Sequence, residues 1–434
     1  MGGLVVAAFL TIAAVRLGAS GFSILEQSTA GLGRSLAGMA SDIYEPSALF
    51  FNPSLSAWHD TPALSLGGNW LHVNANCEKN STSTGRGRDS GDGGGWCHVP
   101  NFDLVYPISN DISLGLAFSA TSGTATKWNP RWIGRYESID TEIAVVEATP
   151  SIAWKLRDNL SIGAGVVLQY AQCEMSRAIP LSFSAGGSRF SFPDGKLKLK
   201  GDSFALGAIL GVSYRPWEHT RLGLSYRTAL TQKLALDGDF RASKEFSATT
   251  GYPRSYKGDA DCDLKLPSVI TFSVAQDVSD RLTFMADVSW TRASVFKELA
   301  VKFDRKSSLG QFIQNATGST SSTNVMKWRD TWRFCAGGEY KLTDKWTLRA
   351  GTAYDLCPFR SEEFRDSSLP DLNRIWLSGG ISYQWNKQLR FDLGYVHIFF
   401  LEDRMKFNTP DGGRACLDVT GDTDVFSYAI TYTF

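Results

Sequence analysis

From residue 63 onward, the chain consists of segments in which hydrophobic and polar residues alternate. In segment 160–178, the bulky apolar Ile162 and Tyr170 share one face, whereas the small Gly163 and Gly165 share the other. Successive side chains of a β-strand point to opposite faces of its sheet, so this period of two predicts strands. The later segments repeat the pattern. We therefore expect an all-β protein.

Short polar turns divide these segments into hairpins. Each turn contains Asn, Asp or Pro, which favour turn conformations, and the six turns lie at 107–111, 156–159, 216–220, 277–280, 342–345 and 385–388. Twelve strands flank them, and one more at each end, near 63–76 and 423–434, raises the predicted number to fourteen. The other connections are long and polar, near 77–99, 126–141, 179–200, 238–261, 301–326, 361–372 and 407–422. An even number of strands with short turns on one side and long loops on the other is typical of an outer-membrane barrel.

Alternation alone does not separate a membrane barrel from a soluble β-sandwich, because each has one apolar face. Long hairpins and Trp217, Trp346 and Trp385 beside the short turns favour a barrel whose apolar face meets lipid. The apolar stretch Leu4–Val15 predicts a signal peptide over 1–19. No Lys or Arg precedes that stretch, so whether the peptide starts upstream of Met1 stays open.

Residues 20–62 do not alternate, and their Gly and Asn-Pro positions predict short helices and turns. A barrel of fourteen strands is too wide for its own side chains to fill, so this segment is expected to form a hatch in the lumen. The expected fold is a 14-stranded antiparallel transmembrane β-barrel over 63–434, with an N-terminal hatch. The last strand ends on an aromatic residue, Phe434. In this it resembles the C-terminal signal that the outer-membrane assembly machinery reads.

Composition narrows the function. Lys plus Arg and Asp plus Glu each number 44, so net charge gives no reason to expect nucleic acid as a partner. The five His lie in no nucleophile motif, so an enzyme is not expected. None of the seven Cys forms a C-x-x-C pair, and neither a metal nor a cofactor is predicted. Cys77 and Cys97 bracket one loop, and whether they form a disulfide is left open.

The run Ser20–Ala57 resembles the hatch of the FadL family of outer-membrane long-chain fatty-acid transporters. The resemblance rests on Gly21-Phe22, on the G-L-G-R of 31–34 and on Asn52-Pro53. It extends through the barrel, notably in Trp346–Asp355 and Ser367–Gly379, to the C-terminus. It implies that a hydrophobic molecule is captured outside and passed to an internal pocket. The molecule then leaves sideways, where the third strand kinks inward.

The same resemblance implies candidate binding residues. Arg177 matches the family arginine at the ligand's polar head, and a guanidinium suits a carboxylate because it offers two parallel donors. Lys327 is a weaker match to a second cation. Cys357 stands where the family has a serine, and Phe22 matches a hatch residue that reaches the pocket.

Other positions are implied to control opening. Gly123 falls at the kink of the third strand, where glycine suits a bulge. Asn52, Pro53 and Ser54 form a hatch motif, with Ser54 in place of the family's alanine. The loop 179–200 is shorter than its family counterpart, which puts an outer capture groove in doubt.

Alternative functions stay open at this point. A fatty acid is the leading ligand because of Arg177, and aromatic hydrocarbons are the alternative within the family. A general diffusion porin and a surface adhesin are rivals from other classes. The expected partners are the hydrophobic ligand, outer-membrane lipid and the assembly machinery, and the chain is expected to be a monomer.

Overall fold

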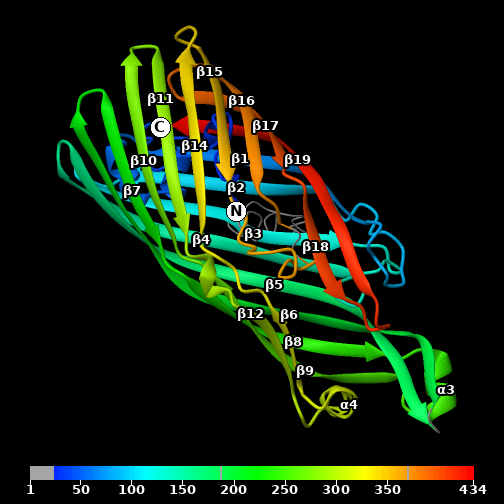
Figure 1. Ribbon diagram of the computed structural model, residues 1–434. Helices are drawn as coiled ribbons and strands as arrows, with labels where there is room; N and C mark the ends of the chain where they lie inside the picture. The colour runs from blue at the N-terminus through cyan, green and yellow to red at the C-terminus, as the bar shows by residue number, and fades with distance from the viewer. Residues whose placement is uncertain (1–23, 186–187, 369–370) are drawn as a thin grey trace.

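The computed structural model describes residues 24–185, 188–368 and 371–434, and the predicted barrel is confirmed (Figure 1). The described strands make fourteen antiparallel passes, and β1 pairs with β19 to close the sheet. Nine passes are single strands: β1 (Ala63–Lys79), β2 (Gly95–Pro107), β3 (Ile112–Lys127), β4 (Asp140–Arg157), β5 (Leu160–Ala185), β6 (Ser188–Trp217), β15 (Trp346–Asp355), β16 (Arg374–Gln384) and β19 (Arg414–Thr433).

The other five passes are each interrupted once. They pair β7 (Thr220–Arg227) with β8 (Leu230–Arg241), β9 (Ser255–Leu266) with β10 (Val269–Ser279), β11 (Leu282–Thr291) with β12 (Glu298–Phe303), β13 (Ser321–Val325) with β14 (Thr331–Lys341), and β17 (Leu389–Phe400) with β18 (Asp403–Asn408). All six predicted short turns lie between consecutive passes. The local turn residues therefore determined the hairpins.

The predicted separation of faces is also present. Ile162, Val166 and Tyr170 are exposed on the outside of the barrel, whereas Val167 and Gln169 between them are buried inside. A ring of exposed bulky apolar side chains around a closed sheet is the surface expected against lipid. In the described part of the chain, no helix has both the length and the apolar character needed to cross a membrane.

Several predicted long loops are too long, because strands continue into them, as β19 does in segment 407–422 from Arg414 onward. Segment 179–200 is a hairpin in which β5 and β6 continue to Ala185 and Ser188. Segments 238–261 and 301–326 likewise extend strands and hold two short helices, α3 (Lys244–Thr250) and α4 (Ser308–Thr317). Above the lipid level the outward face of a strand is polar, so the apolar alternation fades even though the strand continues. These extensions, α3 and α4 share one apolar cluster at the long-loop end of the barrel (Figure 1).

The described part of the N-terminal segment, residues 24–62, lies inside the barrel and is called the internal segment below. It contains α2 (Thr29–Leu32) and two 3-10 helices, η1 (Pro46–Phe50) and η2 (Pro53–Trp58). Ser28 caps α2 and Asn52 caps η2 by accepting backbone N–H groups. The predicted signal peptide 1–19 and Phe22 lie outside the described residues.

Glycines on the inner wall let the internal segment approach closely. A Cβ atom added at Gly211 of β6 would overlap the Asn52 side chain, and one added at Gly351 of β15 would overlap the Arg34 carbonyl. Any larger residue at these positions must displace the segment. The glycines of the inner wall therefore form part of the surface against which the internal segment packs.

We predict that Gly211→Val loosens the internal segment. Overpacking of this kind costs about 1–3 kcal/mol, so the variant should unfold at lower temperature and expose Arg34, which is fully buried in the native protein, to trypsin. Gly379→Val is the matched control, because the nearest atom to its added Cβ lies 3.9 Å away. Equal melting and equal cleavage in the two variants would contradict the packing argument.

Candidate functional site

The wall of the barrel is irregular at β3. Pairing of β2 with β3 ends at Asn101 and Ser119, although β2 continues to pair with β1 as far as Gly95. On the other side of β3, the register with β4 shifts between Ala120 and Ser122, so Thr121 is an extra, bulged residue. Beyond Ser119 the described residues therefore show no ladder between β2 and β3.

The bulge lies close to the predicted kink position. Gly123 is two residues past Thr121 and pairs regularly with Ala144 of β4. The irregularity thus lies at Thr121, where β3 separates from β2, whereas Gly123 is regularly paired. The glycine in the sequence indicated the right region of β3, but the bulged residue is Thr121.

The internal segment bonds to main-chain carbonyl groups of β3 just beyond the point where its pairing with β2 ends. The Ile24 amide donates to the Thr121 carbonyl oxygen at 2.8 Å, and Gln27 Nε2 donates to the Ala120 carbonyl oxygen at 2.7 Å. A buried carbonyl without a partner is costly. The start of the internal segment therefore completes the hydrogen bonding of the wall at this point.

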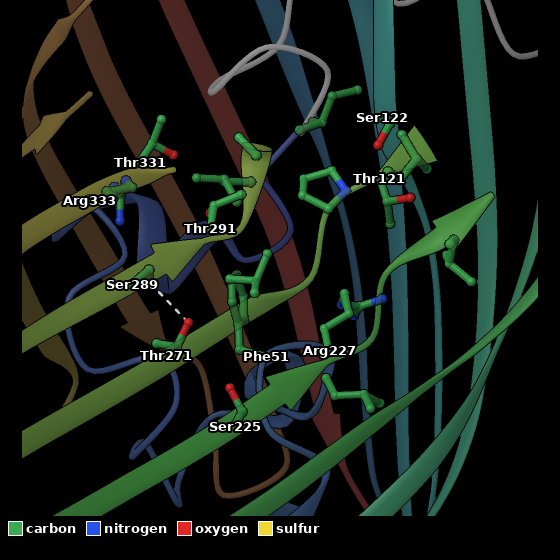
Figure 2. A pocket seen from close by; sticks show the side chains of 18 of the residues that line it. Phe51, Thr121, Ser122, Ser225, Arg227, Thr271, Ser289, Thr291, Thr331 and Arg333 are labelled. Atoms are coloured by element: carbon green, nitrogen blue, oxygen red, sulfur yellow. Dashed lines mark hydrogen bonds between the residues drawn. The ribbon is translucent and has the colours of Figure 1, made fainter. Parts of the chain in front are cut away.

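A cavity of about 150 Å³ lies beside the bulge (Figure 2). Thr121 and Ser122 of β3 line one side, and apolar residues of the internal segment line another. The apolar lining residues include Ile24, Leu25, Leu36, Phe50, Phe51, Ile209, Leu230, Leu266, Val269 and Trp328. We call this space the central cavity. Its apolar walls suit a hydrophobic molecule.

One polar cluster of the central cavity is neutralised internally. Arg227 Nη1 lies 2.6 Å from Glu147 Oε1, and Arg227 Nη2 donates to the Phe50 carbonyl oxygen at 3.1 Å. Gln169 Nε2 also donates to Glu147, at 2.7 Å. These residues were not singled out from the sequence. The sequence indicated only that they occupy inward-facing positions of alternating strands.

A second arginine, Arg333 of β14, lies on another wall of the central cavity. Its Nη2 donates to the Ser35 carbonyl oxygen at 2.9 Å, and its guanidinium lies 4.8 Å from the centre of the Trp376 ring. Sequence reasoning did not identify Arg333 either, because several inward positions of the barrel carry charges. Only its partners in the folded chain distinguish it.

Arg177 lies farther toward the long-loop end. Its Nη2 donates to Ser322 Oγ at 2.9 Å, which places the side chain inward, as strand parity predicted. There it lines a smaller cavity of about 60 Å³, called the outer cavity, together with Glu137 and Leu197. Burial, together with the Asp366 charge and against the opposing effect of Arg177, raises the pKa of the Glu137 carboxyl to about 7.

The other predicted binding residues are not assembled with Arg177. Lys327 is exposed, and its ammonium group lies 4.9 Å from the centre of the Phe364 ring. Cys357 is buried in the apolar cluster, and its amide donates to Asn373 Oδ1 at 2.9 Å. Both residues lie in breaks between strands, where parity no longer indicates direction. Neither residue lines the central or the outer cavity.

The hatch motif anchors the internal segment away from the bulge. Asn52 Nδ2 donates to the carbonyl oxygens of Ala40 at 2.8 Å and Val212 at 3.1 Å, and its Oδ1 accepts from the Ser54 amide at 3.1 Å. Pro53 starts η2. Asn52 and Pro53 therefore contact the wall at β6 and Ser54 contacts it at Ser161 of β5, and none of the three lines the central cavity.

The structure also answers the question of the disulfide. Cys97 is opposite Leu71 in the β1–β2 ladder, and Cys77 lies six residues farther along β1. At the rise of a strand this separation is on the order of 20 Å, far beyond disulfide geometry. Both cysteines are buried, and no disulfide joins them.

Known proteins resemble this chain over nearly its whole length. It is 26% identical to a long-chain fatty acid transport protein of Escherichia coli O6:H1 over 443 residues, which cover 96% of this chain and 94% of that protein. A crystal structure of a Pseudomonas aeruginosa FadL homologue, 28% identical, superposes with a TM-score of 0.83 and covers 96% of this chain and 100% of the other.

The toluene transporter TbuX of Ralstonia pickettii shares the fold with a TM-score of 0.67, at 19% identity and with 94% and 98% of the two chains covered. Residues 10–434 match the family described as outer membrane protein transport protein (OMPP1/FadL/TodX). This match, the fourteen-pass barrel and the overall similarity agree. The chain belongs to the OMPP1/FadL/TodX family of transport proteins, and its barrel lies in the bacterial outer membrane.

Proposed function

We propose that this protein carries long-chain fatty acids across the outer membrane. The observation that carries the proposal is an apolar cavity that contains arginine and lies beside the unpaired edge of β3. The Escherichia coli relative, a long-chain fatty acid transport protein, supports the same substrate class. A channel for aromatic hydrocarbons needs no cation, and burying one is costly unless a charged partner is bound.

The route we propose runs from the outer cavity to the central cavity and then sideways past β3. Arg177 lies 17 residues beyond Leu160 at the start of β5, whereas Thr121 lies nine beyond Ile112 at the start of β3. The bulge is therefore closer to the short-turn end. Lateral exit lets the acyl chain enter lipid directly, and each methylene kept from water is worth roughly 0.8 kcal/mol.

The internal segment is proposed to act as the hatch that keeps the lumen closed. It is held by two ion pairs to the wall, Arg34–Glu339 at 3.0 Å and Glu45–Arg390 at 2.5 Å. An open diffusion pore is disfavoured because the segment packs against several strands at once. The assembly role of Phe434 and the monomeric state remain predictions from the sequence.

The hatch is tested by ion conductance. We expect the intact protein in planar bilayers to pass little current, and a variant that lacks residues 22–54 to pass a large, steady one. The physical reason is that a fourteen-strand barrel without its plug leaves an aqueous lumen. A stable, porin-sized conductance in the intact protein would favour the diffusion-porin alternative.

Lateral exit is tested by removing the bulge. Deletion of Thr121 removes the extra residue of β3 and lets the β3–β4 register run without a shift. We expect uptake of labelled oleate by cells to fall at least about tenfold, while oleate affinity of the purified variant stays within about threefold. Gly123→Ala, in regular register, is the control. Unchanged uptake after the deletion would mean that the ligand leaves by another route.

The outer cavity predicts a dependence of capture on pH. Below pH 7 Glu137 is uncharged, so Arg177 is available to an anionic head group. Above pH 7 the Glu137 carboxylate competes for Arg177. We expect capture of hexadecyl sulfonate, whose head group stays ionised, to be faster at pH 6 than at pH 8.

Two variants separate the contributions to this effect. Glu137→Gln should remove the pH dependence, and Arg177→Ala should slow capture of the sulfonate about ten- to a hundred-fold, the loss of a charge-assisted contact of roughly 1.5–3 kcal/mol. Hexadecane is the uncharged control. If Arg177→Ala slows capture of both compounds equally, the variant has disturbed the cavity and Arg177 does not recognise the head group.

A further inference from the structure

The central cavity has two chemically different sides (Figure 2). The internal segment contributes five lining residues, all of them apolar: Ile24, Leu25, Leu36, Phe50 and Phe51. Every polar side chain that lines the cavity belongs instead to the barrel. A ligand in the cavity therefore meets only hydrocarbon from the internal segment, and it meets all of its polar neighbours on the barrel wall.

Hydroxyl groups are the commonest polar groups of the cavity. Eight serine and threonine residues line it: Thr121, Ser122, Ser225, Thr228, Thr271, Ser289, Thr291 and Thr331. Each hydroxyl can donate one hydrogen bond and accept others. The wall is thus suited to ligand atoms that both donate and accept.

Five of these hydroxyls form one contiguous group across four passes of the barrel. Thr271 of β10 lies opposite Ser225 of β7 and opposite Ser289 of β11 in the two ladders. Thr291, two residues along β11, lies opposite Thr331 of β14. Directly opposite residues of antiparallel strands have Cβ atoms about 4.5–5.5 Å apart. We call these five residues the hydroxyl row.

Part of the hydrogen-bonding capacity of the hydroxyl row is unused. Thr271 and Ser289 bond to each other at 2.9 Å, and because that bond uses only one of their two protons, the other can still be donated. Within the described part of the chain, the hydroxyls of Ser225, Thr291 and Thr331 make no hydrogen bond, although Ser225 and Thr331 are buried. The hydroxyl row therefore offers donors and acceptors to a molecule in the cavity.

The charged groups of the cavity, in contrast, have partners in the chain. Arg227 and Glu147 form an ion pair at 2.6 Å. Arg333 lies opposite Asp355 in the β14–β15 ladder, and Asp287 accepts a hydrogen bond from a main-chain amide of the internal segment. The hydroxyl row is therefore the polar feature of the cavity for which the chain itself provides the fewest partners.

Such a wall discriminates between ligands. Water can bond to the hydroxyl row until a ligand displaces it, and a chain of methylenes alone returns no partner for the hydroxyls that it covers. A hydroxyl on the ligand donates and accepts, so it replaces the displaced water. Buried polar groups discriminate strongly against an analogue that lacks the matching group, because they are then left unpaired.

We propose that the central cavity selects long-chain acids that carry a hydroxyl group on the acyl chain. This inference rests on the proposed function and narrows its substrate class. The ligand hydroxyl bonds to the hydroxyl row, while the methylenes on the other side of the chain pack against Leu36, Phe50 and Phe51 of the internal segment. The two sides of the cavity thus match the two sides of a hydroxylated chain.

The test compares stearate with the monohydroxystearates, a series in which one hydroxyl group moves along the same chain. Calorimetry of the intact, detergent-purified protein should show a maximum within the series, and the best isomer should bind about ten- to a hundred-fold more tightly than stearate. A maximum is expected because the ligand hydroxyl must lie at the height of the hydroxyl row when the rest of the chain is in place.

A double variant tests whether the hydroxyl row causes the preference. In Ser225→Ala, Thr331→Val the best isomer should bind about tenfold more weakly, whereas stearate should bind as tightly as before or more tightly. Thr423→Val is the matched control, because Thr423 and Thr331 are both 3% exposed but Thr423, on the inner face of β19, does not line the cavity. The control variant should change neither affinity.

The outcomes separate this inference from the proposed function. If the native protein binds neither stearate nor any hydroxystearate, the proposed function fails. If it binds stearate at least as tightly as every isomer, or if the preference survives in the folded double variant, only the role of the hydroxyl row is overturned. Retention of heat-modifiable migration in gels shows that the variant is folded.

Discussion

The need to satisfy every main-chain polar group in the membrane constrains the whole structure. Closure of β1 on β19 meets this requirement around most of the barrel. At β3 the sheet alone does not meet this requirement, because β3 pairs with β2 only as far as Ser119. Just beyond that point, Ile24 and Gln27 donate hydrogen bonds to the carbonyl oxygens of Thr121 and Ala120. The internal segment is therefore part of the hydrogen bonding of the wall, and a shift of its first residues must change the wall where a ligand could leave.

The internal segment is not held equally along its length. Charges alternate through Arg34, Glu339, Arg349, Asp392, Arg390 and Glu45, and they tie its middle to β14, β15 and β17. Its start at Ile24 contacts the bulge through the two hydrogen bonds described above and lines the central cavity. We expect a ligand that fills the cavity to act on this start first, because among the described residues hydrogen bonds alone, and no ion pair, hold it to the wall. Under the proposed route, such a difference lets the pore stay closed while the wall opens.

The sequence determined the fold because its signals are local. Alternation over 160–178, turn residues such as those of 107–111 and the non-alternating stretch 20–62 each depend on neighbours in the chain, and they predicted the passes, the turns and the direction of Arg177. The prediction failed where a strand continues beyond the lipid and its outward residues are no longer apolar. Segment 179–200 is strand, but above the lipid its outward residues include Lys196, Lys198 and Lys200. The apolar alternation that marks a lipid-facing strand is therefore absent there.

The tertiary structure alone decided which inward charges are neutralised. Arg227 and Arg333 both line the central cavity, yet Arg227 forms an ion pair with Glu147, three passes away in the sheet, whereas Arg333 lies opposite Asp355 of the neighbouring β15. The position of the bulge at Thr121, and the separation of Lys327 and Cys357 from Arg177, likewise depend on register between distant segments. The physical reason is that the pattern of one strand fixes which way a side chain points, whereas the partner it meets is set by strands and hatch residues far away in the chain.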